Sequence, residues 1–442
     1  MNGDNGGKSE NTGATGALEM MSFGVAQFAA SIYAAFTAYY LMMFFTDVAM
    51  IPPAVTAVLL ICYRLFSAVD TQVIGLAINR TRFRDGKYRP LYKWFALPFA
   101  IGLAALGMTP GVYAPLRVVY GAFILIICDL SWSTLHTASL SMLPYLARDD
   151  ISRTKFMSFS NGSSIIAFIL VGTFLLPIAS ILGGEDRNKG IALTLALLAV
   201  IALPLLFNAY FNLKERHYIE PEKKSAIKDV YLAILSNRRI MLFFAGLSLY
   251  FMADAFKNLT AYYYISFVMA RPNLLPWIIM SGLVSPLLMQ PVIPRLLKIA
   301  KKESLIIFGL FSASCSSLLM LAAVDRPYAL LVCVVLYGAF TSIVANLVFA
   351  VMASFSDEIR LRNNISMSEI LAATMNLGSN LGAAVASGSA ALAMEAFGYS
   401  AQSDVQTAGA LMGIKVLYII CTASGLAIAG AVFVIFIRFG KD

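Results

Sequence analysis

The chain alternates between long apolar runs and short polar breaks along almost its whole length. Twelve of the runs are long enough to cross roughly 30 Å of hydrocarbon as helices. They cover 21–46, 53–78, 91–110, 118–146, 157–182, 190–212, 240–270, 275–297, 304–323, 328–353, 366–396 and 410–437. Six precede and six follow a longer polar segment. The pattern predicts an all-α membrane protein with twelve transmembrane helices.

Polar segments divide the chain into four parts. Residues 1–20 are rich in Gly and polar residues, and we expect a disordered cytoplasmic tail there. Residues 21–213 and 240–442 are expected to form an N-terminal and a C-terminal six-helix bundle, the second with a short cytoplasmic tail. The linker between them, 214–239, has amphipathic spacing from Ser225 to Leu235 that suits a membrane surface.

Composition supports the membrane class. The chain is 59% hydrophobic and 13% charged, with a mean hydropathy of +0.77. A soluble protein of this size would need more charge to cover its surface. The net charge of +9 need not indicate nucleic acid, because Lys and Arg gather on the cytoplasmic loops of membrane proteins. The expected partners are therefore the lipid bilayer and a small molecule, with no nucleic acid.

The basic residues distinguish the two sides of the membrane. Loops after even-numbered spans carry most of the Lys and Arg, for example between Arg80 and Arg89. Loops after odd-numbered spans hold only Arg117, Arg187, Lys189, Arg271 and Arg326. Because such an excess marks cytoplasmic loops, we expect both termini on the cytoplasmic face of a plasma (inner) membrane.

The second span contains two ionisable residues, Arg64 and Asp70. Charges inside hydrocarbon are costly, so they usually face a cavity and mark a substrate or ion pathway. This favours a transporter. The two residues are six apart and face different sides of one helix, so Arg64 is expected to pair with a carboxylate of a neighbouring helix as a structural charge. Asp70 is the better candidate for coupling transport to a cation.

Several motifs, in order and spacing, match a known family. They are YYLMMFFTDV (39–48), R-x5-D-x4-G from Arg64 followed by TRFRDGKYRP (81–90), DLSWSTL (129–135), KER (214–216), AYYYISFV (261–268) and NLGSNLG (376–382). The set resembles the glycoside–pentoside–hexuronide cation symporters of the major facilitator superfamily, to which melibiose permease belongs. The resemblance implies a major facilitator fold of two six-helix bundles, transport by alternating access, and a monomer.

The chain departs from this family at the cation site. Sodium-coupled members carry a carboxylate cluster in the second span, where this chain has Ser67, Asp70 and Thr71. A hard cation such as Na⁺ takes several oxygen ligands, and here one carboxylate and two hydroxyls remain. We therefore expect coupling to H⁺, with Na⁺ coupling or no coupling left open. No other cofactor is expected.

The fourth span carries the candidate solute site. The resemblance implies that Asp129 is retained from the sugar site, flanked by Trp132 and Ser133, so that a carboxylate and an aromatic face could receive a hydroxylated solute. The Lys of the family's eleventh span is replaced by Asn376. His136 lies seven residues after Asp129, on nearly the same helical face, as a proton relay or ligand donor, or else as a packing group.

The seventh span adds charges that the family pattern does not explain. Asp254 and Lys257 are three apart, hence about one turn from each other on a helix. They form either a self-neutralising pair that lowers the cost of insertion, or a solute site in which Lys257 meets an anionic or hydroxylated ligand with Tyr263 nearby. Both interpretations stay open at this point.

These observations favour a symporter that moves a glycoside or related hydroxylated compound with H⁺. The alternative keeps the fold and carries an amphiphilic, lipid-like or anionic compound. A non-transporting receptor is less favoured. A membrane enzyme is also less favoured, because the two histidines form no H-E-x-x-H and no G-x-S-x-G or nucleotide loop occurs. Five cysteines, all inside predicted spans, predict neither a metal site nor a disulfide framework.

Overall fold

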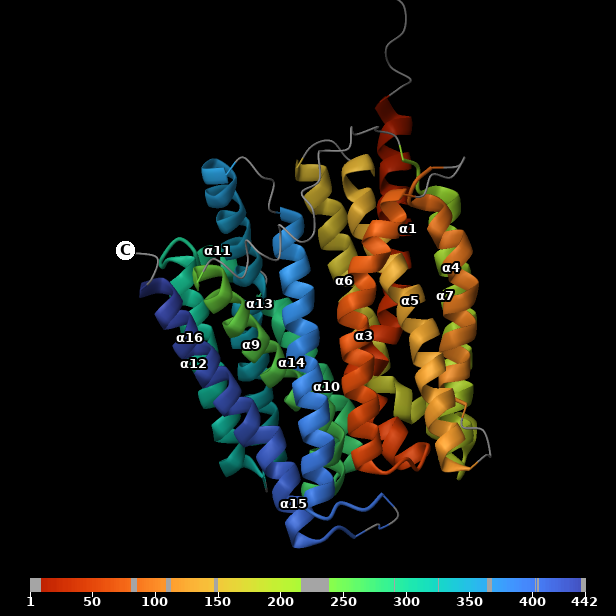
Figure 1. Cartoon of the computed structure of the whole chain (residues 1–442), viewed down its shortest axis with the longest axis vertical. Helices are drawn as coiled ribbons and strands as arrows, with labels where there is room; N and C mark the ends of the chain where they lie inside the picture. Colours follow the sequence, from red (N-terminus) through yellow and green to blue (C-terminus); the bar gives the residue numbers. More distant parts are fainter. Residues whose placement is uncertain are drawn as a thin grey trace, which may run out of the picture. The chain divides into compact units, whose positions relative to one another are not determined.

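The computed structural model consists of long helices joined by short loops (Figure 1). It describes residues 9–80, 86–108, 113–146, 150–215, 238–289, 291–324, 326–363, 368–401, 403 and 405–438. Within these ranges no β-strand occurs. Ten helical segments are long and apolar enough to cross a membrane. The predicted all-α membrane class is therefore confirmed.

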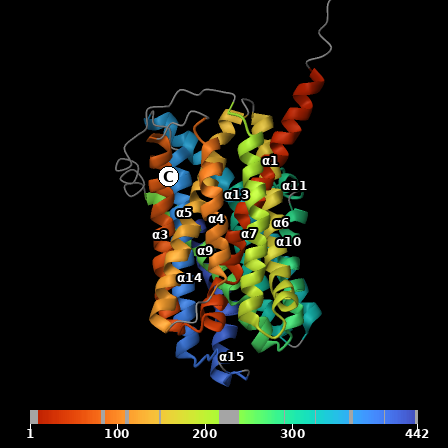
Figure 2. The ribbon, with the colours of Figure 1, turned by 90° about the vertical axis from the view of Figure 1, so that its right-hand side faces the viewer.

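The chain forms two compact units, the first of which holds Met1–Thr37 and Val69–Pro221. Its helices are α1 (Ser9–Tyr39), the later part of α3 (Pro53–Arg80), α4 (Arg89–Leu106), α5 (Ala114–Leu146), α6 (Asp150–Gly183) and α7 (Arg187–Asn212). In this unit α4 packs between α5 and α7, and α6 packs against α7 (Figure 2).

The second unit holds Ala38–Ala68 and Glu222–Asp442. It begins with α2 (Leu41–Met43), the π-helix η1 (Phe44–Val48) and the first part of α3. Its later elements are α9 (Arg238–Tyr263), η2 (Tyr264–Val268), η3 (Pro272–Leu274), α10 (Leu275–Met289), α11 (Ile293–Leu296), α12 (Lys302–Leu319), η4 (Met320–Ala323), α13 (Pro327–Asn363), α14 (Ser368–Ala396), α15 (Ala408–Lys415), η5 (Val416–Cys421) and α16 (Thr422–Arg438). Helix α9 packs against α14 and α16, and α12 packs against α13 and α16 (Figure 1).

Two helix ends in the second unit have the same backbone geometry. η1 and η2 are both five-residue π-helices that follow an α-helix. After η1, the N–H of Ala49 donates to Phe44 O at 2.8 Å and that of Ile51 to Phe45 O at 2.9 Å. After η2, the N–H of Met269 donates to Tyr264 O at 3.0 Å and that of Arg271 to Ile265 O at 3.2 Å. We call these two segments, 44–51 and 264–271, the paired corners.

The paired corners also share an unusual residue conformation. Met50 and Ala270 have φ angles of 53° and 51°, and they are the two non-glycine residues with positive φ in the described part of the chain. They occupy equivalent positions, each six residues after the start of its π-helix. A proline follows two residues later in each corner, at Pro52 and Pro272. This match is the geometry that two structural repeats would produce at the ends of their first helices.

The structure differs from the sequence expectations at the start of the first helix. α1 begins at Ser9, inside the segment expected to be a disordered tail, because Ala17, Leu18 and Glu19 are good helix formers that extend the apolar helix. Glu19 is buried in this extension. The linker, with its expected surface helix at Ser225–Leu235, lies outside the described residues.

The number of membrane helices remains a prediction. α4 and α14 cover the predicted spans 91–110 and 366–396, but they are not among the ten segments that are apolar enough to cross by composition. α4 begins with Arg89 and has Lys93 in its second turn, which lowers its hydropathy. The other ten predicted spans coincide with the ten segments.

Candidate functional site

One face of α5 carries four of the predicted site residues. Asp129, Trp132, Ser133 and His136 follow the spacing that places side chains on one side of a helix. Asp129 and Ser133 are 0% and 1% exposed, while Trp132 and His136 are half-buried. α5 therefore presents an acid, an indole, a hydroxyl and an imidazole as one continuous polar stripe inside the first unit.

Asp70 of α3 joins this stripe. Its side chain is 4% exposed and its carboxyl lies within interaction distance of Asp129, Ser133 and Thr71. Thr71 Oγ1 donates to Asp70 Oδ1 at 3.1 Å. The sequence assigned Asp70 to the cation and Asp129 to the solute, whereas the structure brings the two carboxyls into one group. We call Asp70, Thr71, Asp129, Trp132 and Ser133 the acidic cluster.

Tyr33 of α1 completes the surroundings of the acidic cluster. Its hydroxyl donates to Asp129 Oδ1 at 3.4 Å, and its ring lies 6.3 Å from that of Trp132. The sequence analysis did not single out Tyr33. The first span contains several other tyrosine, serine and threonine residues, so the sequence carried no signal that distinguished Tyr33.

Some polar atoms of the acidic cluster are buried without a hydrogen bond of good geometry from the described residues. Among them are Asp70 Oδ2, Trp132 Nε1 and Ser133 Oγ. Buried polar atoms are nearly always satisfied by protein, water or a ligand. A carboxylate oxygen, an indole N–H and a hydroxyl are therefore available together for a ligand with hydroxyl groups or for a proton.

His136 does not reach into this group directly. Its ring stacks on that of Trp132 with 5.2 Å between centroids and 15° between planes. The stacking covers part of the indole surface and fixes its orientation. This contact matches the packing alternative for His136, while its role as a proton relay remains a prediction.

The second unit has a different polar group around Lys257 of α9. The Lys257 ammonium lies 3.4 Å from the ring centroid of Tyr337 and 5.5 Å from that of Tyr418. Its Nζ is 3.7 Å from Met320 Sδ, and the side chain is 6% exposed. An ammonium held by aromatic faces gains cation–π energy. Lys257 is thus enclosed by soft partners rather than oxygen ligands.

Asp254 lies one turn before Lys257 and supplies the opposite charge. Asn258 Nδ2 donates to Asp254 Oδ2 at 2.9 Å, and the Tyr337 hydroxyl donates to Asp254 Oδ1 at 3.5 Å. Tyr337 therefore contacts both charges, Asp254 through its hydroxyl and Lys257 through its ring. Sequence reasoning missed Tyr337 because it lies on α13, far along the chain.

The remaining predicted site residues lie elsewhere. Arg64 is half-buried with its guanidinium 5.2 Å from the Tyr63 ring centroid, and no carboxylate pairs with it among the described residues. Ser67 is buried. The Tyr263 hydroxyl is 2.7 Å from Thr46 Oγ1, away from the Lys257 group. The Asn376 side chain lies outside the described residues. No group of three or more His, Cys, Asp or Glu suited to a metal occurs within them.

Comparison with known proteins gives the family. The model of MFS/sugar transport proteins matches residues 22–441. The isoprimeverose transporter of Lactiplantibacillus pentosus is 25% identical over 429 residues, 96% of this chain and 89% of that protein. The putative glycoside/cation symporter YagG of Escherichia coli K12 is 22% identical over 383 residues, 86% of this chain and 83% of that protein.

Solved structures agree with this assignment at the level of fold. The nucleoside transporter NupG, as its D323A mutant, superimposes with a TM-score of 0.69 at 13% sequence identity, covering 95% of this chain and 99% of that one. The chain is a multi-pass membrane transport protein and not an enzyme. It belongs to the MFS/sugar transport family, as a secondary transporter of the glycoside–pentoside–hexuronide cation symporter branch.

Proposed function

We propose that this protein is a symporter that carries a glycoside or a related hydroxylated compound together with H⁺. The observation that carries the proposal is the acidic cluster, in which Asp70 meets Asp129 beside Trp132 and Ser133. The names of the relatives, an isoprimeverose transporter and a putative glycoside/cation symporter, support the solute class. The transport cycle is alternating access.

The solute part of the proposal rests on Trp132 and Ser133. A sugar presents an apolar ring face and a rim of hydroxyls, so it is recognised by an aromatic surface together with hydrogen-bonding groups. Trp132 offers the indole face not covered by His136 and a buried Nε1 donor. Ser133 Oγ and Asp129 offer acceptors on the same helix face. These groups suit two or three neighbouring hydroxyls.

The coupling part rests on the proximity of two carboxyls. Two like charges in water-poor surroundings repel each other, which makes the pair a place where a proton can be taken up and released. Taking up or releasing that proton changes how Asp129 bonds to a solute hydroxyl. The occupancy of the solute site and that of the proton site are thereby linked.

Sodium is the second candidate for the coupling ion. The structure places a second carboxylate, Asp129, beside Asp70, together with the hydroxyls of Thr71 and Ser133. This gives an all-oxygen set of the kind that hard cations take, which the second span alone does not contain. We place the protein in a plasma (inner) membrane with cytoplasmic termini, as the loop charges predict. The family resemblance implies a monomer.

Uptake into proteoliposomes tests the proposal. Isoprimeverose and melibiose are offered with an inward proton gradient, an inward Na⁺ gradient or neither, and an organic sulfonate and a lysolipid serve as alternative solutes. We expect proton-driven glycoside uptake in the unmodified protein. Asp70→Asn is expected to retain binding without accumulation, and Asp129→Asn to lose both. Binding is measured separately by thermal unfolding, because a solute at 100 times its dissociation constant raises the free energy of unfolding by about 2.7 kcal/mol.

The control variant is Asp186→Asn, which lies outside the acidic cluster. Asp186 caps α7 by accepting the Lys189 N–H at 3.1 Å, and Asn caps a helix equally well, so transport should be unchanged. Uptake driven by a Na⁺ gradient but not by a proton gradient would show that the coupling ion is Na⁺ and not H⁺. Binding of the sulfonate or lysolipid but no glycoside would overturn the proposed solute class.

A further inference from the structure

The Thr-Asp pair at the end of the first helix is bonded to residues far away in the sequence. Thr46 Oγ1 and the Tyr263 hydroxyl are 2.7 Å apart. Thr46 also donates to Asp47 Oδ1 at 2.7 Å, and the Tyr399 hydroxyl donates to the same Asp47 oxygen at 3.0 Å. With Tyr263 as donor, Thr46 remains able to donate to Asp47, so the bonds form one chain. We call these four residues the corner latch.

The corner latch is built in a buried, aromatic setting. Thr46, Tyr263 and Tyr399 are 2%, 0% and 6% exposed. The rings of Tyr263 and Tyr399 meet edge to face, with centroids 5.3 Å apart, and Phe267 packs against Tyr399 at 5.7 Å. Hydrogen bonds away from water are stronger electrostatically, and leaving one of their groups unpaired is expensive. Breaking the Thr46–Tyr263 bond therefore leaves the buried Tyr263 hydroxyl in need of another partner, whereas Thr46 Oγ1 also lies 3.1 Å from Met42 O.

The latch lies on the paired corners. Thr46 and Asp47 belong to η1, and Tyr263 immediately precedes η2. Single π-turns are frequent at functional sites, and the left-handed conformations of Met50 and Ala270 are of the strained kind that clusters at switch regions. Two such features coincide at one place in the fold. Neither is needed merely to end a helix, since a loop would do so at lower cost.

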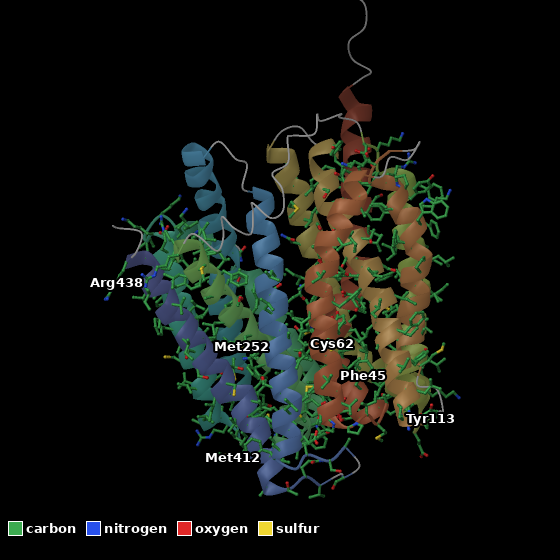
Figure 3. All side chains as sticks on the ribbon, viewed as in Figure 1. Phe45, Cys62, Tyr113, Met252, Met412 and Arg438 are labelled. Carbon is green, nitrogen blue, oxygen red and sulfur yellow. The ribbon has the colours of Figure 1, made fainter. Side chains whose placement is uncertain are left out.

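The latch includes residues of a segment that leaves the first compact unit, joins the second and returns. Residues 38–68 belong to the second compact unit, although α1 and α3, which flank them, continue into the first. The first corner is at the far end of α1, and the second is at the far end of α9, which begins after the linker. The latch therefore lies at the helix ends opposite Arg438. Figure 3 shows the two ends of the second unit, with Met412 of α15 at one and Arg438 of α16 at the other.

We propose that the corner latch is a gate of the transport cycle, which holds residues 38–68 to the second unit in one state and releases them in the other. The inference rests on the proposed function only in assuming that the protein alternates between two states. Residues 38–68 move with α1 and α3 when the latch is broken. In that state water replaces the hydrogen-bond partners within the latch, at Thr46, Asp47, Tyr263 and Tyr399.

Chemical labelling of a buried position beside the latch tests the gate. Ala49 is 4% exposed and follows Asp47 closely. Ala49→Cys is introduced after the five native cysteines, all of them free, are replaced by Ser. A membrane-impermeant maleimide is applied from each side of the membrane in turn, without any solute. Thr46→Val and Tyr263→Phe are each expected to raise the labelling rate about two- to tenfold, from one side only.

Two further comparisons separate a gate from a merely structural bond. The double variant Thr46→Val/Tyr263→Phe should label no faster than Thr46→Val, because the one latch bond that Tyr263→Phe removes is already lost in Thr46→Val. Tyr120→Phe is the control, since it removes a partly buried Tyr hydroxyl bond to Ala105 O, 2.7 Å long, in the first unit. It should leave labelling at Ala49→Cys unchanged.

Equal labelling in the variants and the Tyr120→Phe control, or additive effects of the two latch substitutions, would overturn the proposal. Hydrogen exchange of segments 44–51 and 264–271 provides the same comparison without Ala49→Cys, in case that variant does not fold. We expect faster exchange at both segments together in each latch variant. Because no solute is used, failure of the proposed glycoside transport would leave this result intact.

Discussion

Glu215 binds the backbone that begins α4. Its Oε1 accepts the N–H groups of Tyr88 and Arg89 at 2.7 and 2.8 Å, and its Oε2 accepts the Lys87 N–H at 2.8 Å. A carboxylate at a helix N-terminus satisfies orphan donors and complements the helix dipole. Gly86, at φ 119°, leaves room, because a Cβ there would lie 3.0 Å from Glu215 Oε1. Two separate family motifs, GKYRP and KER, thus form one structural contact.

Replacing Glu215 by Ala should destabilise the first unit. The change leaves three N–H groups without their acceptor, and we expect the free energy of unfolding to fall by about 1–3 kcal/mol. Thermal unfolding in detergent measures this. Glu185→Ala is the control, because Glu185 is exposed in the loop before α7. Equal melting temperatures for the two variants would mean that the contact contributes nothing.

Replacing Trp132 by Phe should weaken solute binding more than it affects folding. Phe keeps an aromatic face but removes the buried Nε1 donor, so affinity for the glycoside that the uptake assay identifies is expected to fall about two- to tenfold. Calorimetric titration of the purified protein measures the affinity. Trp277→Phe serves as the control, since Trp277 is 59% exposed on α10. If both variants bind like the unmodified protein, the indole donor does not contact the solute.

A double-mutant cycle at Lys257 and Asp254 distinguishes the two interpretations of this pair. Lys257→Met leaves the Asp254 charge without its counter-charge and should cost about 3–5 kcal/mol, while Lys257→Met/Asp254→Asn should recover most of that loss. Lys93→Met, at an outer position near the Tyr210 ring, should change stability by less than about 0.5 kcal/mol. Full transport by the stable double variant would leave only the self-neutralising role. Loss of transport with normal folding would assign the pair to the solute or to coupling.

Sequence patterns predicted the helices well because hydrocarbon sets their length. The predicted spans 53–78 and 190–212 correspond to α3 (Pro53–Arg80) and α7 (Arg187–Asn212). The pattern did not reveal where a helix breaks inside an apolar run. The predicted span 275–297 divides into α10 and α11, since Pro291 supplies no N–H at the break.

The sequence predicted the candidate site residues that share one helix, but not their partners on other helices. Asp129, Trp132, Ser133 and His136 share a helix, so their spacing alone places them on one face. The partners from other helices were not predictable in this way. Tyr33 bonds to Asp129, and Tyr337 encloses Lys257, because helices distant in sequence pack together. An apolar run carries no signal of which helix will be its neighbour.

The paired corners predict that an Ala→Gly substitution stabilises the protein at a corner and destabilises it inside a helix. Ala270 has a φ of 51° and is exposed, so its methyl group packs little. A left-handed conformation costs a residue with a Cβ roughly 1–2 kcal/mol, which exceeds the entropic cost of glycine, about 0.5–1 kcal/mol. Ala270→Gly should therefore raise the free energy of unfolding by about 0.5–1 kcal/mol.

The same substitution inside a helix should have the opposite effect. Ala383 lies in the interior of α14, and Ala383→Gly is expected to lower the free energy of unfolding by about 1 kcal/mol. Met50→Gly, at the equivalent position of the first corner, should have the sign of Ala270→Gly with a smaller gain, because the Met side chain, although 45% exposed, loses more contact area than a methyl group. Thermal or denaturant unfolding of the three variants measures the contrast. If Ala270→Gly and Ala383→Gly destabilise equally, Ala270 is not left-handed in the folded protein, and the paired corners lose the strain that the gate would use.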